Sequence, residues 1–198
     1  IFISHITSPT ALILPIKEII QMAKSRGILT IVDGAHVPGH IPLNINDLGC
    51  DFYTGALHKW LCMPKGTTFL YVKKAHQNWV SPVVKSWGDK GEDPGPSNFL
   101  KEFQWQGTND LSSFLTVPSA INFYNKHIKQ NKNDCFLLAS EASSKFNQIL
   151  GTNRIYEGGN WIGQMVAHPL PKNAPEDLKD ILLKDFKIEI PIFEWNGI

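Results

Sequence analysis

The N-terminal part of the chain alternates apolar runs of strand length with one amphipathic segment. Residues 1–6 (Ile-Phe-Ile-Ser-His-Ile) predict a buried strand. A helix is predicted from about Leu12 to Arg26, because apolar residues recur there on one face and Gly27 follows as a typical helix-ending glycine. Residues 28–32 then form a continuous apolar run, which is typical of a strand covered on both faces. This order predicts a β–α–β unit and a parallel sheet.

Two further strands are predicted at residues 51–53 and 67–72, on either side of a turn that contains His58 and Lys59. In open parallel sheets, ligands bind in the loops that leave the carboxyl ends of the strands. Asp33 and Lys59 both lie at or just after such a strand end. A binding site is therefore expected at this edge of the sheet.

The remaining sequence is less regular and predicts a second domain. Glycine and proline residues mark a long loop at residues 85–98. The later expected elements are a helical stretch to about His127, a helix at 133–150 closed by Gly151, a strand at 161–167, a helix that begins near 174–178 and a strand at 187–192. The domain change is expected within residues 130–150, so that the two domains comprise residues 1–130 and 131–198.

Composition and charge exclude several classes of function. The 198 residues, 42% of them apolar, suffice for one core and part of another. A net charge of +1 with scattered basic residues argues against a nucleic acid or an acidic membrane as partner. No apolar run reaches the roughly 20 residues that span a bilayer. The three cysteines lack CxxC spacing, which fits a reducing compartment. We therefore predict a cytoplasmic protein.

Both ends of the sequence indicate a piece of a longer protein. The chain has no initiator methionine and opens directly in the predicted strand of residues 1–6. It stops at residues 193–198, where a turn after a strand would lead into another element. We therefore expect a fragment, with part of any catalytic machinery outside it.

Lys59 and Asp33 carry the chemistry that pyridoxal phosphate requires. A lysine amine can form an imine with the cofactor aldehyde, and an aspartate at a strand end can keep the pyridine nitrogen protonated. His36 is placed to contact the ring hydroxyl or the substrate, and His58 to donate to the phosphate. Taken singly, each residue has an ordinary structural role as a solvated lysine, a turn-forming aspartate or a hydrogen-bonded histidine. Their joint order and spacing favour the cofactor site.

Five motifs in this order resemble the class V aminotransferase family of fold-type I pyridoxal phosphate enzymes. They are residues 7–10 (Thr-Ser-Pro-Thr), 32–39 (Val-Asp-Gly-Ala-His-Val-Pro-Gly), 51–60 (Asp-Phe-Tyr-Thr-Gly-Ala-Leu-His-Lys-Trp), 64–66 (Pro-Lys-Gly) and 106–110 (Gln-Gly-Thr-Asn-Asp). The branch with the greatest similarity is that of the isopenicillin N epimerase-like proteins, which are related to the cysteine desulfurases. The resemblance runs from Ile3 to about Asp110 and weakens beyond it.

The resemblance implies an α/β fold and a set of site residues. Residues 1–130 would be part of the large cofactor-binding domain, a mainly parallel sheet with helices on both faces, and residues 131–198 the start of a smaller α+β domain. Lys59 would form the internal aldimine, and Asp33 would pair with the pyridine nitrogen. His36 would lie beside the ring hydroxyl and His58 near the phosphate.

The family also implies a homodimer with shared active sites. Gly107 and Thr108 match a segment that reaches the phosphate of the neighbouring subunit. Two positions depart from the desulfurase pattern: Ala56 replaces a phosphate-binding serine, so that Thr54 is the candidate for that contact, and Ser8 replaces an asparagine near the ring hydroxyl. Residues 184–198 contain no cysteine to accept sulfur, so desulfurase activity is not expected.

Two functions remain open from the sequence. The first is an enzyme that transforms an amino acid or its derivative as an epimerase, a transaminase or a carbon–sulfur lyase. The second is a truncated, non-catalytic remnant of the fold or a partner subunit. In the family, a ring-stacking residue and a carboxylate-binding arginine fall outside the matched segment. The isolated 198-residue piece is therefore expected to bind the cofactor poorly and to be inactive.

Overall fold

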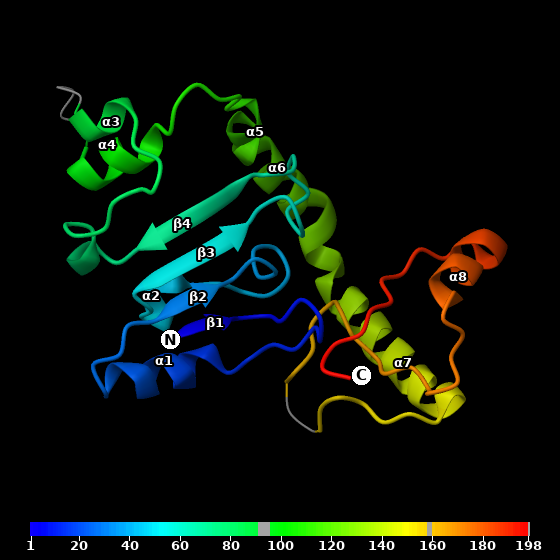
Figure 1. Cartoon of the computed structure of the whole chain (residues 1–198). Coiled ribbons are helices and arrows are strands. Elements are labelled where there is room, and N and C mark those ends of the chain that lie inside the picture. The colour runs from blue at the N-terminus through cyan, green and yellow to red at the C-terminus, as the bar shows by residue number, and fades with distance from the viewer. Residues whose placement is uncertain (91–95, 158–159, 198) are drawn as a thin grey trace. The chain divides into compact units, whose positions relative to one another are not determined.

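The computed structural model describes residues 1–90, 96–157 and 160–197. The chain divides into two compact units (Figure 1). Unit 1 comprises Ile1–Ile6 and Leu14–Gln130, and unit 2 comprises Thr7–Ile13 and Asn131–Ile198. No helix within the described residues has the length and apolar character needed to cross a membrane.

Unit 1 contains a four-stranded sheet in the order β1-β2-β3-β4. Its strands are β1 (Phe2–Ser4), β2 (Ile31–Asp33), β3 (Phe52–Ala56) and β4 (Thr68–Val72). The first three are parallel, which confirms the predicted β–α–β arrangement. β4 pairs antiparallel with β3, because the connection between them is short and a parallel return needs a longer crossover.

Helix α1 (Ile16–Lys24) supplies the apolar layer on one face of the sheet. It is shorter than predicted, because the residue before Pro15 is disfavoured in the α conformation and the helix begins after this proline. Its buried Ile16 and Ile20 pack with Val32 and Tyr53 of the sheet. The short helix α2 (Ile45–Leu48) adds apolar contacts to the same cluster.

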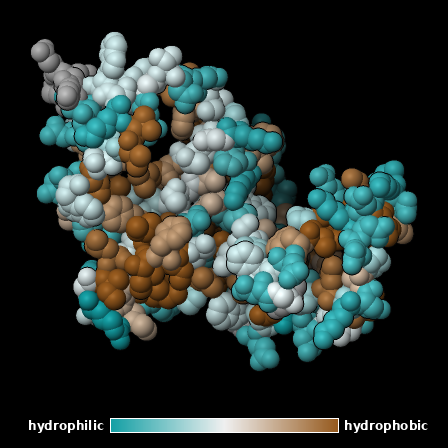
Figure 2. All heavy atoms as spheres, in the orientation of Figure 1, coloured by the Kyte–Doolittle hydropathy of each residue, from teal (hydrophilic) through white to brown (hydrophobic). Residues whose placement is uncertain are grey.

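The opposite face of the sheet is apolar and exposed. Phe2, Ile31 and Leu70 share this face, as the strand register shows, and they are 70%, 43% and 51% exposed. Figure 2 shows hydrophobic residues gathered over the strands. Three of the four strands are parallel, and parallel sheets are normally covered on both faces.

Several short helices follow the sheet in unit 1. They are the 3₁₀ turn η1 (Lys74–His76), α3 (Trp87–Lys90), α4 (Asn98–Gln104), α5 (Ser112–Leu115), α6 (Val117–Phe123), the π turn η2 (Tyr124–Ile128) and the 3₁₀ turn η3 (Lys129–Asn131). The prediction of a helical stretch to about His127 is confirmed. The loop expected at residues 85–98 contains α3, and its residues 91–95 lie outside the described part of the chain.

Unit 2 contains the helices α7 (Lys132–Leu150) and α8 (Leu178–Phe186). The prediction that Gly151 closes α7 is confirmed, since this glycine adopts the left-handed conformation with φ 63°. The strands predicted at 161–167 and 187–192 are wrong: the structure shows no strand in either segment. Strand formation needs a partner for the backbone groups, which an apolar run alone does not supply.

Candidate active site

Asp33 ends β2, and the chain turns sharply after it. One carboxylate oxygen, Oδ1, accepts a hydrogen bond of 2.9 Å from the backbone N–H of Ala35. The N–H of Val37 donates to the carbonyl of Gly34 at 2.9 Å and closes the next turn. This aspartate turn holds His36 just beyond the strand end.

Lys59 lies in the loop after β3, beside the loop after β2. β2 and β3 are adjacent and parallel, so their carboxyl ends open at the same edge of the sheet. The side-chain Nζ of Lys59 lies 3.0 Å from Nε2 of His36. The structure therefore brings together three predicted site residues: Asp33, His36 and Lys59.

The protonation of His36 follows from its surroundings. Burial lowers the pKa of His36, and the positive charge of Lys59 lowers it further against an opposing effect of Asp33. A neutral imidazole accepts a hydrogen bond from the Lys59 ammonium through Nε2 and carries its own proton on Nδ1. That Nδ1 is buried and has no hydrogen-bond partner within the described residues. A buried N–H without an acceptor fits a site that receives a polar ligand.

His58 and Thr54 already have hydrogen bonds to the β3–β4 hairpin. Nδ1 of His58 lies 3.3 Å from the carbonyl oxygen of Thr67. The hydroxyl of Thr54 donates to the carbonyl of Phe69 at 3.1 Å. The hydroxyl oxygen of Thr54 and Nε2 of His58 can still bind a ligand.

The remaining predicted residues lie apart from this group in the chain. Ser8 belongs to unit 2, in a turn where Leu12 N–H donates to the Thr7 hydroxyl at 2.9 Å. Gly107 adopts a positive φ of 110°, which favours glycine, and the exposed Thr108 follows it in unit 1. Among the described residues, no hydrogen bond joins Gly107 or Thr108 to Lys59.

Two contacts between the β2 and β3 loops escaped the sequence-based prediction. The buried His40 contacts the carbonyl of His36 through Nδ1 at 3.1 Å, and its ring packs against Trp60 with centroids 4.1 Å apart. Gly39 has a φ of 85°, and a Cβ there would lie 2.9 Å from the carbonyl oxygen of Trp60. The sequence signal for these contacts was that His40 directly follows the motif of residues 32–39.

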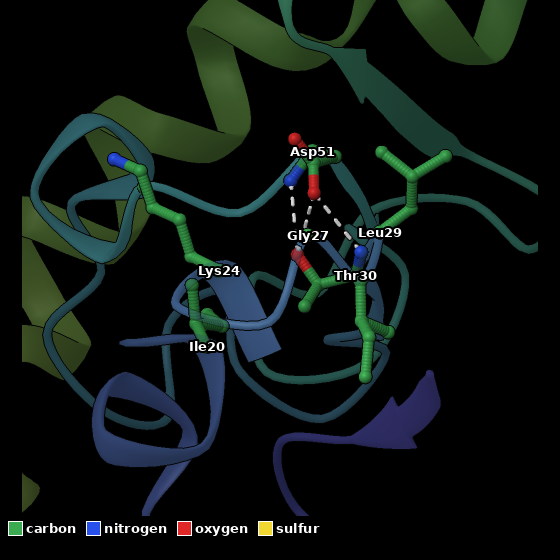
Figure 3. A pocket seen from close by; sticks show the side chains of 8 residues that line it. Ile20, Lys24, Gly27, Leu29, Thr30 and Asp51 are labelled. Carbon is green, nitrogen blue, oxygen red and sulfur yellow. Dashed lines mark hydrogen bonds between the residues drawn. The ribbon is translucent and has the colours of Figure 1, made fainter. Parts of the chain in front are cut away.

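A small pocket lies at the opposite end of the strands from Lys59. Its volume is about 160 Å³, and its lining includes Ile20, Lys24, Thr30 and Asp51. Figure 3 shows Asp51 hydrogen-bonded to Thr30 at its edge. Within the described residues, no group of three or more histidine, cysteine or acidic side chains is placed to hold a metal ion.

Comparison with known proteins identifies a family and a fold. The sequence profile of the family Aminotransferase class-V matches residues 1–191. The chain is 32% identical to the isopenicillin N epimerase of Amycolatopsis lactamdurans, covering 98% of this chain and 52% of that protein. It is 33% identical to an L-cysteine desulfhydrase of Arabidopsis thaliana, covering 96% of this chain and 43% of that protein. The chain thus spans about half the length of these relatives.

Solved structures share the fold at low sequence identity. A pyridoxamine-pyruvate aminotransferase from Mesorhizobium loti has a TM-score of 0.72 at 16% identity, over 95% of this chain and 49% of that one. A cysteine desulfurase from Thermococcus onnurineus has a TM-score of 0.71 at 19% identity, over 95% of this chain and 48% of that one. These likenesses confirm the predicted α/β fold of the fold-type I enzymes.

Proposed function

Because this chain belongs to the class V aminotransferase family, we propose that the full-length protein is a pyridoxal phosphate-dependent enzyme acting on an amino acid or its derivative. Membership of the family implies this cofactor. The observation that carries the proposal is the 3.0 Å contact between Lys59 Nζ and His36 Nε2, next to the strand end formed by Asp33. When bound, the cofactor supplies an electrophilic carbon and a ring that stores the electrons released at the substrate's α-carbon.

The free polar atoms of this site match the groups of the cofactor. Oδ1 of Asp33 accepts the Ala35 N–H, whereas within the described chain no residue donates to its other oxygen, which can accept a hydrogen bond from the protonated ring nitrogen. The buried Nδ1 of His36, which has no partner among the described residues, can donate to the ring hydroxyl. His58 and Thr54 are the candidates for hydrogen bonds to the cofactor phosphate. We also propose that the protein forms a homodimer, in which Gly107 and Thr108 reach the cofactor phosphate of the neighbouring subunit.

The proton of Lys59 determines whether its amine can act as a nucleophile. Only the neutral amine attacks a carbonyl carbon. The neutral Nε2 of His36 accepts a hydrogen bond from Lys59. His36 therefore orients the Lys59 amine.

The reaction type is proposed only as a class. The relatives include an isopenicillin N epimerase, L-cysteine desulfhydrases and a hercynylcysteine sulfoxide lyase. We propose epimerase, transaminase or carbon–sulfur lyase chemistry for the full-length protein. The substrate is an amino acid or its derivative, since the α-amino group is what exchanges with a lysine amine at this cofactor.

Chemical trapping tests the role of Lys59. The protein from the complete reading frame is mixed with pyridoxal phosphate, reduced with borohydride, and digested for peptide mapping. We expect the pyridoxyl label on Lys59, and loss of the label in Lys59→Arg. The matched control is Lys65→Arg, a change of an exposed lysine in the same β3–β4 connection, which should leave the label in place. A label on another lysine in the wild-type protein would refute the proposal.

A further inference from the structure

Two buried polar side chains meet beneath the loop that carries Asp33. His5 follows β1 and is 8% exposed, and Tyr53 lies in β3 and is 0% exposed. Nδ1 of His5 lies 3.0 Å from the hydroxyl oxygen of Tyr53. Because β2 runs between β1 and β3, this contact spans the strand that ends at Asp33. The backbone N–H of His5 also donates to the carbonyl of Asp33 at 2.8 Å.

The Tyr53 side chain occupies the space next to Gly34. A Cβ added to Gly34 would overlap the hydroxyl oxygen and the adjacent ring carbons of Tyr53. The backbone at Gly34 can lie this close to β3 only because glycine lacks a side chain. The N–H of Gly34 also donates to the carbonyl of Thr54, the next residue of β3, at 2.8 Å. The position of Gly34 is thus fixed by both a hydrogen bond and a direct contact.

Both members of the pair are neutral. Burial lowers the pKa of His5. Burial also raises the pKa of Tyr53, with smaller contributions from the charges of Cys50 and Asp33. The contact is therefore a hydrogen bond between an uncharged imidazole and an uncharged phenol, and removal of either partner leaves a buried polar atom unpaired.

We propose that His5 and Tyr53 are positioning residues that fix the loop from Asp33 to His36 at the cofactor site. This inference rests on the proposed function, because the loop carries the groups that would hold the ring. Neither residue need touch the cofactor. The Tyr53 hydroxyl, held by His5, supports Gly34 and so determines where the Asp33 carboxylate and the His36 imidazole lie.

Amide hydrogen exchange tests the inference in cofactor-free protein. In Tyr53→Phe and His5→Leu, we expect the N–H groups of Gly34 and Ala35 to exchange roughly fivefold faster or more, since a buried nitrogen or hydroxyl loses its partner. His5→Asn keeps a hydrogen-bonding group near the position of Nδ1 and should restore slower exchange. Tyr71→Phe is the matched control, because Tyr71 pairs with Tyr53 across β3 and β4 and packs against the same core.

Cofactor affinity is the second measurement, made on the full-length protein at a temperature where circular dichroism shows every variant folded. Tyr53→Phe and His5→Leu should weaken binding of pyridoxal phosphate roughly tenfold. They should also shift the pH profile of the bound cofactor's absorbance, because Asp33 and His36 move relative to the ring. Tyr71→Phe should change neither quantity, and His5→Asn should lie near the wild-type values.

The outcomes separate the inference from the function on which it rests. Unchanged exchange of Gly34 in both Tyr53→Phe and His5→Leu would overturn the inference, as would a lower melting temperature with unchanged cofactor affinity and pH profile. Absence of cofactor binding in the wild-type protein would overturn the proposed function alone, since the exchange data still report on the loop. If Tyr53→Phe does not fold, His5→Leu and His5→Asn decide the question.

Discussion

The two ends of the sheet each carry an aspartate, and the two carboxylates are used differently. Asp51, at the amino end of β3, accepts hydrogen bonds from Thr30 through Oδ2 and from His76 through Oδ1. Asp33, at the carboxyl end of β2, accepts one backbone N–H through Oδ1, and in the described chain its other oxygen accepts none. Both oxygens of the Asp51 carboxylate accept hydrogen bonds, so Asp51 has a structural role. Asp33 has one oxygen that accepts no hydrogen bond in the described chain, so this oxygen can bind a ligand.

The same contrast holds for the histidines near these carboxylates. Nε2 of His76 lies 2.8 Å from Asp51, and the indole N–H of Trp79 donates to Nδ1 at 3.3 Å, so both ring nitrogens are paired. His36 uses Nε2 for Lys59 and leaves Nδ1 buried without a partner among the described residues. Unpaired buried polar atoms lower stability, so the unpaired nitrogen of His36 supports the proposal that this end of the sheet binds a ligand.

Lys59→Arg should produce the largest effect, and it should be an effect on activity. Arginine keeps a positive charge near His36 but does not form an imine. We expect the activity of the full-length enzyme to fall by at least about 10³-fold. The free energy of unfolding should change by less than about 0.5 kcal/mol, because the Lys59 side chain is exposed. Steady-state kinetics and urea denaturation measure the two quantities.

A large loss of stability in Lys59→Arg would contradict the contrast between a ligand-binding end and a structural end of the sheet. If Lys59→Arg lowered stability as strongly as a change at Asp51, Lys59 would be a structural residue. The Lys65→Arg variant controls for the loss of an exposed lysine in the same connection.

Asp51→Asn should produce the converse result, a loss of stability without a loss of cofactor affinity. The amide places an N–H group where one carboxylate oxygen accepted from Thr30 or His76, so at least one hydrogen bond is lost. We expect the free energy of unfolding to fall by about 1–3 kcal/mol. Lys73 adds little, since its side chain is 38% exposed.

The matched control is Asp180→Asn in α8. Asp180 pairs with Lys184 at 3.1 Å, but both side chains are highly exposed, so the change should be within about 0.5 kcal/mol. An equal effect of the two substitutions in urea denaturation would contradict the structural role of Asp51.

The pH dependence of stability should distinguish the two ends in separate ranges. Burial acts to raise the pKa of Asp51, but hydrogen bonds from His76 and Thr30 outweigh it and the pKa is lowered from 3.8. The unfolded chain then binds a proton more readily than the folded chain. The stability from Asp51 is therefore complete above about pH 4 and is lost as the pH falls through the folded pKa.

His36 acts in a higher pH range. Its pKa is lowered from 6.5, first by burial and then by Lys59, so the unfolded chain binds the proton first as the pH falls. Stability should decrease from about pH 6.5 downward, and the buried His5 contributes in the same direction. In urea denaturation at several pH values, His36→Gln should flatten the upper step and Asp51→Asn the lower one. Flattening of the same step by both variants would refute the assignment.

The candidate site at the carboxyl ends of β2 and β3 could be predicted from sequence because its signals are local. Asp33 follows a run of strand residues, and Lys59 lies in a motif of contiguous residues, so each position is readable without knowledge of the strand order. Parallel pairing of β2 and β3 then brings the two loops together. The membership of the family and the α/β fold were predicted on the same basis and are confirmed.

The buried pair beneath the loop could not be predicted in this way. His5 and Tyr53 meet only because β1 and β3 flank β2, and neither residue carries a sequence signal for that order. The wrong strands at 161–167 and 187–192 have a related cause. An apolar run specifies burial and periodicity, but a strand exists only where another backbone pairs with it.

Trp79→Phe should give the smallest effect, at the structural end. The indole N–H donates to Nδ1 of His76, which requires the imidazole to carry its proton on Nε2, facing Asp51. Phenylalanine keeps an aromatic ring beside His76 but removes this donor. We expect a loss of less than about 0.5 kcal/mol in the free energy of unfolding, because Trp79 is 57% exposed, and a smaller population of the Nε2–H tautomer in nitrogen NMR spectra. Trp87→Phe is the control, because Trp87 is 85% exposed in α3 and its replacement should alter neither quantity. If Trp79→Phe leaves the tautomer of His76 unchanged, the hydrogen bond to Asp51 alone fixes this tautomer. The hydrogen bond from Trp79 would then have no part in setting it.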